Sequence, residues 1–126
     1  MSQDYKKIIL DIKARKEDRI QAAFQLENDA DDTVVDALGK ALLTDPSPIV
    51  RHECALSLGE TGHPEKAAPY LIKSIEIDKH VFVVHEALLA LATLGDQTYI
   101  PLIKKYLYDP RPEIAESAEI ALERLA

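Results

Sequence analysis

The sequence predicts an all-α fold, an α-α superhelix (solenoid) of four helical hairpins that form a single domain over residues 1–126. The stretch 50–62, VRHECALSLGETG, returns 33 residues later as 83–95, VVHEALLALATLG, and weaker copies surround residues 19–24 and 115–120. Three aspartates, Asp45, Asp78 and Asp109, stand seven residues before the same position of successive copies. A period of 31 to 33 residues with two helices per unit is typical of helical solenoids.

Apolar periodicity and the residues between the apolar runs predict eight helices. The first three are expected at 4–14, 17–28 and 34–43, and a fourth follows the 45–48 segment and ends near 59–62. A fifth opens at 63–65, a sixth runs from about 82 to 95, a seventh covers 98–107 and the last ends at 125. These helices pair into repeats at approximately 4–29, 31–61, 64–94 and 97–125.

The expected core follows from the same periodicity. In the first helix the stripe consists of Tyr5, Ile8, Ile9 and Ile12. In the second helix Ile20, Ala23 and Phe24 are expected to point inward, with Ala22 as a further candidate. The single cysteine, Cys54, is interpreted as a small buried hydrophobic residue, because no neighbouring motif would lower the pKa of its thiol.

The segments between helices contain capping residues and helix breakers. The segment 29–33, DADDT, offers capping side chains for the third helix. In Asp45-Pro46-Ser47-Pro48, Ser47 can cap the fourth helix and proline is tolerated in its first turn. His63 and His80 are both interpreted as exposed turn residues.

Composition narrows the functional classes. The formal net charge is −7 and no basic stripe is present, which disfavours nucleic-acid binding and favours a basic or lysine-containing protein as partner or substrate. No apolar run approaches the roughly 20 residues that cross a membrane, and no signal peptide is expected. One cysteine cannot form an internal disulfide, so we expect a cytoplasmic protein.

The candidate chemistry is an adjacent His-Glu pair in each of the two central repeats, His52-Glu53 and His85-Glu86. Adjacent helical residues point about 100° apart, so one pair does not grip a metal from one side. The two histidines occupy equivalent positions on neighbouring helices, so we expect their imidazoles to approach one another and share an ion. Imidazole and carboxylate donors suit iron or another borderline divalent ion, with open positions for O2.

One chain supplies only two such histidines, so the sequence predicts a homodimer. Across a two-fold axis, Glu53 or Glu86 of each chain could reach the metal of the other, giving two irons per dimer. A simpler interpretation stays open: the histidines are solvated residues of a repeat surface, and the second pair was copied from the first by duplication.

The corner Asp45-Pro46-Ser47-Pro48-Ile49-Val50-Arg51, the Ala-x-x-x-Leu helix and the closing glycine resemble short HEAT-like repeats. Arg51-His52-Glu53 with Leu58-Gly59, and His85-Glu86-Ala87, resemble one half of the deoxyhypusine hydroxylases, a family of HEAT-repeat di-iron monooxygenases with two such halves. The chain is also similar to HEAT repeats of the phycobilin-lyase type, which match the corners and helices without requiring metal.

The resemblance implies roles for the four residues. His52 and His85 would ligate one iron, Glu53 would reach the second iron, and Glu86 would orient a basic substrate as a catalytic residue or act as a further ligand. It implies a di-iron, O2-activating monooxygenase acting on a lysine-derived side chain. The alternatives are a non-catalytic protein-interaction scaffold and an O2- or iron-binding protein without turnover.

Overall fold

The computed structural model describes residues 2–28 and 31–126, and within these ranges it is helical and contains no β-strand. This confirms the all-α fold class and the helical solenoid. The elements in chain order are α1 (Ser2–Leu10), α2 (Lys16–Leu26), α3 (Asp32–Thr44), α4 (Pro48–Glu60), α5 (Pro64–Ile77), α6 (Val81–Thr93), the 3-10 helix η1 (Gln97–Tyr99), α7 (Ile100–Lys104), the 3-10 helix η2 (Lys105–Tyr108) and α8 (Pro112–Leu125). No helix in this part of the chain is long and apolar enough to cross a membrane.

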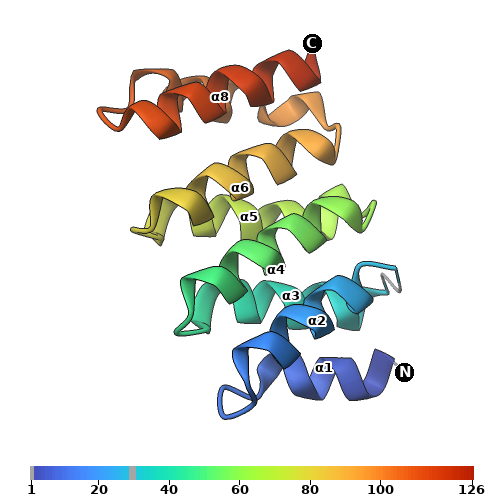
Figure 1. Cartoon of the computed structure of the whole chain (residues 1–126). Helices are drawn as coiled ribbons and strands as arrows, with labels where there is room; N and C mark the ends of the chain where they lie inside the picture. Colours follow the sequence, from blue (N-terminus) through green and yellow to red (C-terminus); the bar gives the residue numbers. More distant parts are fainter. Residues whose placement is uncertain (1, 29–30) are drawn as a thin grey trace.

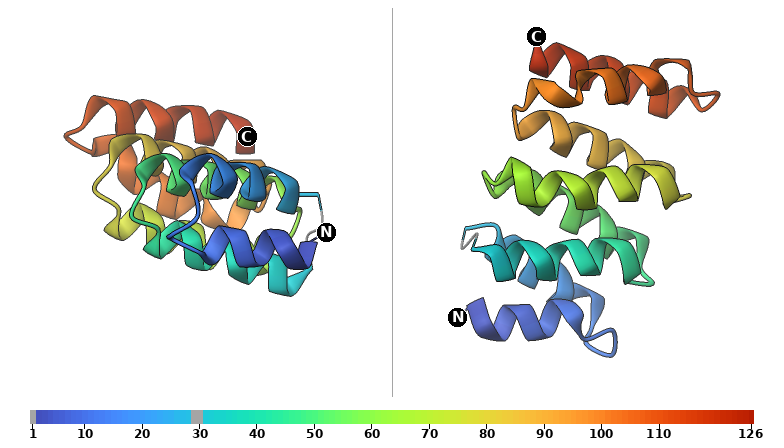
Figure 2. Two further views of the ribbon diagram at one scale, coloured as in Figure 1. Left: turned by 60° about the horizontal axis from the view of Figure 1, so that its bottom comes forward. Right: turned by 180° about the vertical axis from the view of Figure 1, so that it is seen from behind.

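The helices form two layers that rise together from the N-terminus to the C-terminus (Figure 1). We call α2, α4, α6 and α8 the even layer, and α1, α3, α5 and α7 with η2 the odd layer; Figure 2 shows them from two further sides. Within the even layer, α4 packs against both α2 and α6, and α6 packs against α8. Each helix of the layer therefore meets the equivalent helix of the next repeat.

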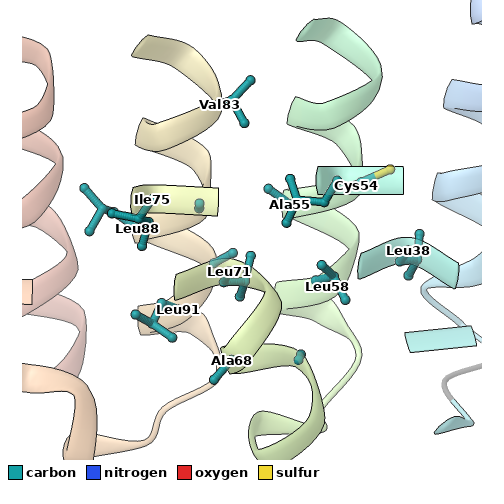
Figure 3. Packing of buried hydrophobic residues seen from close by; sticks show 14 of the residues in the cluster. Leu38, Cys54, Ala55, Leu58, Ala68, Leu71, Ile75, Val83, Leu88 and Leu91 are labelled. Carbon is teal, nitrogen blue, oxygen red and sulfur yellow. The ribbon is translucent and has the colours of Figure 1, made fainter. Parts of the chain in front are cut away.

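One continuous apolar core lies between the layers (Figure 3). Leu58 of α4, Leu71 of α5 and Leu88 of α6 are fully buried in it. Cys54 is also fully buried, and burial raises the pKa of its thiol, so its interpretation as a small hydrophobic residue is confirmed. Because neighbouring repeats share this core, no single hairpin buries its apolar face alone.

Capping follows the sequence prediction where the structure describes it. The side chain of Ser47 accepts a hydrogen bond from the amide of Val50 at the start of α4. Asp31 does the same for α3, while residues 29 and 30 of the predicted capping segment lie outside the described residues. Gly62 and Gly95, just after α4 and α6, have φ of 72° and 79°, a left-handed conformation that glycine adopts without steric cost.

Ion pairs connect consecutive repeats along the solenoid. Arg19 of α2 reaches the loop of the next repeat and contacts Asp45 at 2.9 Å, with side-chain exposures of 4% and 1%. Arg51 of α4 contacts Asp78 in the same way at 2.8 Å, with exposures of 18% and 6%. The third aspartate, Asp109, pairs instead with Arg111 of its own loop, at 2.9 Å. Val84 stands at the arginine position of the third repeat and carries no charge.

The first helix is shorter than predicted, and Ile12 is 60% exposed, so its placement on the buried stripe is wrong. The guanidinium of Arg19 donates to the carbonyls of Ile12 and Ala14, and Asp11 accepts from the amide of Lys13. These bonds stabilise a turn in place of a further helical turn.

Two other expectations differ from the structure. Phe24 is 54% exposed, whereas Ala22 and Ala23 are fully buried and Ile20 is half-buried. Small residues face the packed neighbours of α2, and the phenyl ring lies on the outer surface of the even layer. The predicted seventh helix is one short α-helix, α7, with the 3-10 segments η1 and η2 on either side.

Candidate metal centre

The four predicted ligands lie on α4 and α6, one turn after each helix begins. We call the equivalent positions Ile20, His52, His85 and Glu116, one on each helix of the even layer, the site row. Ser47 caps α4, and Asp45 accepts a hydrogen bond from the amide of Ser47, so these two residues fix where α4 begins and how far along it His52 lies. All four predicted ligands are half-buried.

The close approach of α4 and α6 depends on one glycine. A Cβ at Gly59 would lie 2.8 Å from the Cβ of Ala90 and 2.9 Å from its Cα. These distances are shorter than side chains allow, so the helices are in backbone contact two turns beyond His52. The contact brings the ligand-bearing ends of the two helices within side-chain reach.

The structure brings His52, Glu53 and Glu86 together. Nε2 of His52 lies 3.3 Å from Oε2 of Glu86 across the helix boundary, and its Nδ1 lies 3.8 Å from Oε1 of Glu53. The site-row histidine of α4 thus contacts a glutamate of α6 that follows the row position of that helix. The sequence predicted an approach of His52 to His85. The carboxylate that contacts the His52 ring belongs to Glu86, the residue that follows His85.

His85 faces the next repeat. Its Nδ1 lies 2.5 Å from Oγ of Ser117 on α8. It lines a pocket of about 200 Å³ together with Phe82, Ser117 and Ile120, whereas His52 lines a pocket of about 430 Å³ that also includes Ile49 and Phe82. Phe82 is common to both pockets.

Sequence reasoning missed Ser117. Its signal is the register of the repeats: Ser117 follows Glu116, as Glu53 follows His52 and Glu86 follows His85. A comparison of that position in all copies would have identified it. His63 and His80, expected to be exposed turn residues, are exposed at the starts of α5 and α6.

The carboxylates around His52 affect its protonation. Hydrogen bonding to Glu86 is the main cause that raises the pKa of His52 above its usual value; burial opposes it and Glu53 contributes less. Because the folded-state pKa is raised, the protonated ring stabilises the metal-free protein at pH below the unfolded-state pKa. This contribution is lost as the pH rises through the folded-state pKa.

Glu86→Gln is therefore expected to lower the pKa of His52 toward that of an exposed histidine, as measured by an NMR titration of the metal-free protein. Glu53→Gln is the matched control and should cause a smaller decrease, because Glu53 is farther from the ring. An equal decrease in both variants would contradict the conclusion that Glu86, on the neighbouring helix, is the main cause of the raised pKa of His52.

Comparisons with known proteins identify the family to which this fold belongs. A family profile of HEAT repeats matches residues 7–78 and 35–123. Deoxyhypusine hydroxylase-B of Oryza sativa subsp. japonica is 37% identical over 110 residues, which make up 86% of this chain and 35% of that protein. Deoxyhypusine hydroxylase of Candida albicans is 37% identical over 116 residues, 85% of this chain and 36% of its own length. The chain thus spans about a third of the length of these relatives.

Solved structures show the same relationship. Human deoxyhypusine hydroxylase in complex with glycerol superposes with a TM-score of 0.91 at 28% identity, covering 98% of this chain and 43% of that one. The complex of CpcE and CpcF of phycocyanin lyase from Nostoc gives a TM-score of 0.74 at 26% identity, covering 99% of this chain and 52% of that one. The chain therefore belongs to the HEAT-repeat family and is related to the deoxyhypusine hydroxylases.

Proposed function

We propose that this chain provides half of a di-iron, O2-activating site and that two copies complete the site as a homodimer. One observation carries the proposal: His52, Glu53 and Glu86 lie in contact on adjacent even-layer helices of a chain whose fold matches part of a deoxyhypusine hydroxylase. His85, in the same row, supplies the second imidazole.

The donors fit iron in type and fall short in number. Imidazole and carboxylate are the donors of non-haem iron sites. In residues 2–28 and 31–126, however, no group of three or more histidine, cysteine, aspartate or glutamate side chains is arranged to hold an ion. Donors from a second copy would supply the missing ligands, with Glu53 of each copy directed to the iron of the other.

Exposed apolar side chains lie before and after the site row along the helices of the even layer. This supports a second copy of the chain as the partner. Three residues before the histidines, Ile49 is 52% and Phe82 is 60% exposed. Four residues after the row positions, Phe24, Leu56 and Ile120 are exposed as well. Large apolar side chains around a polar centre are typical of an interface that excludes water when it closes.

The residues of this chain suggest the class of substrate. Two half-buried glutamates beside the imidazoles and a net charge of −7 favour a cationic, lysine-derived side chain. Glu86 would orient that side chain or ligate a metal, and Ile49 and Phe82 would keep water from the closed site. Iron, when bound, would supply the redox centre for hydroxylation.

Replacement of His52 or His85 by alanine tests this function. After anaerobic reconstitution and desalting, the unmodified chain should retain about one iron per chain, and each variant should retain much less. His63→Ala is the matched control, because His63 is exposed and lies outside the site row. Equal iron retention by His52→Ala and His63→Ala would contradict the proposal.

The exposed apolar side chains also favour a second function, a scaffold that binds another protein without metal. A scaffold would keep its partner when both His52 and His85 are replaced. An iron- or O2-binding protein without turnover would retain iron and form no hydroxylated product from a lysine-derived peptide supplied with O2 and a reductant.

A further inference from the structure

We propose that Ser117 is a positioning residue that holds His85 as the Nδ1–H tautomer and thereby leaves Nε2 as the nitrogen that binds metal. This inference rests on the proposed function, because it assigns to His85 a role as a ligand. It also gives the fourth repeat, which carries no His-Glu pair, a part in the site.

The direction of two hydrogen bonds determines the tautomer. Oγ of Ser117 lies 2.6 Å from the carbonyl oxygen of Glu113, one helical turn earlier in α8. A carbonyl oxygen only accepts, so the single hydroxyl proton of Ser117 is donated there. The contact of 2.5 Å between Oγ and Nδ1 of His85 then needs its proton from the ring. In a neutral imidazole with the proton on Nδ1, Nε2 carries the free electron pair.

The register of the repeats explains why Ser117 contacts a histidine of the preceding repeat. Glu86, which follows the row position of the third repeat, contacts His52 of the second repeat. Ser117, which follows the row position of the fourth, contacts His85 of the third. The same register of contact thus occurs twice, but at different ring nitrogens: a carboxylate meets Nε2 in the first case and a hydroxyl meets Nδ1 in the second. Unlike a carboxylate, the hydroxyl adds no charge to the ring environment.

The surroundings of Ser117 keep its hydroxyl in place. Ser117 is fully buried between α6 and α8, and its neighbours Ile114 and Ala118 are fully buried as well. A hydroxyl fixed by its own helix cannot follow a rotating imidazole, so it selects one ring orientation. Metal-ligating histidines commonly donate their second ring nitrogen to such a partner, whose loss costs about 10–100-fold in metal affinity.

The test is to determine the tautomer of His85 by NMR, from the nitrogen shifts of its ring in labelled, metal-free protein at a pH where the ring is neutral. The unmodified chain should show the Nδ1–H form. Ser117→Ala should increase the Nε2–H form, which neutral histidine prefers in water. Ser57→Ala is the matched control: Ser57 is also buried in the even layer and donates to a backbone carbonyl, that of Ala23, without contact to His85.

A predominant Nε2–H form in the unmodified chain would overturn the proposal, as would an unchanged tautomer in a folded Ser117→Ala variant. The measurement on the unmodified chain can overturn the proposal even if that variant does not fold. Because the protein is free of metal, the result does not depend on the proposed function. In an iron titration, Ser117→Ala should bind about 10-fold more weakly than Ser57→Ala. A correct tautomer in a chain that binds no iron would count against the proposed function alone.

Discussion

Asp45→Ala is expected to lower the free energy of unfolding by about 3–5 kcal/mol, because it leaves the buried guanidinium of Arg19 without its counter-ion. Asp45 accepts from Nε and Nη2 of Arg19 at 2.9 and 3.2 Å and from the amide of Ser47 at 2.9 Å. Small domains are stable by about 5–15 kcal/mol, so the loss would be a large part of the total. Urea denaturation followed by circular dichroism measures it.

The other loop aspartates give a graded control series. Asp78→Ala should cost less than Asp45→Ala, because Arg51 is more exposed than Arg19 and can be hydrated. Asp109→Ala should cost about 1 kcal/mol or less, since Arg111 is 40% exposed. Asp45→Asn, which keeps a hydrogen-bond acceptor, provides a milder variant if the alanine variant does not fold. Equal losses of unfolding free energy in all three alanine variants would show that burial of the arginine partner does not determine the cost.

Gly59→Ala is expected to destabilise the protein by about 1–3 kcal/mol through overpacking, although alanine is favoured over glycine in a helix by about 1 kcal/mol. The new Cβ would meet the backbone of Ala90, which cannot rotate away as a side chain can. Separation of α4 from α6 should also weaken the contact of His52 with Glu86 and lower the pKa of His52. Denaturation and NMR titration measure the two effects.

Gly39→Ala is the matched control for this variant. It also adds a Cβ to a crowded helical glycine, but the group it meets is the ring of Tyr70 in the odd layer. Both variants should lose stability, and only Gly59→Ala should change the His52 titration. An unchanged pKa of His52 in a destabilised Gly59→Ala variant would show that the close helix contact does not position the site.

The repeat pattern predicted the fold class, the serine cap at Ser47 and the closing glycines, because each depends on local sequence. The apolar periodicity within single helices, by contrast, wrongly placed Ile12 and Phe24 in the core. The end of α1 depends on Arg19, a residue from the next helix, and the exposure of Phe24 depends on which face of α2 meets neighbouring repeats. Periodicity within one helix contains neither kind of information.

For the candidate site, the sequence singled out His52, Glu53 and Glu86, which lie in contact, but not which of their atoms meet. His52 and His85 are equivalent in sequence, yet one ring contacts Glu86 and the other contacts Ser117. The offset between adjacent helices pairs each row position with the following position of the next repeat. That offset is a property of helix packing, to which Gly59 contributes. The spacing of the repeats therefore points to the position of Ser117 but does not show which side chain it contacts.

The most direct test is native mass spectrometry of the protein after anaerobic reconstitution with iron. A chain that supplies half of a di-iron site should appear as a dimer that carries two irons, and His52→Ala should lose the iron. A monomer without iron, under conditions in which the chain is folded, would contradict the proposal that two copies complete the site.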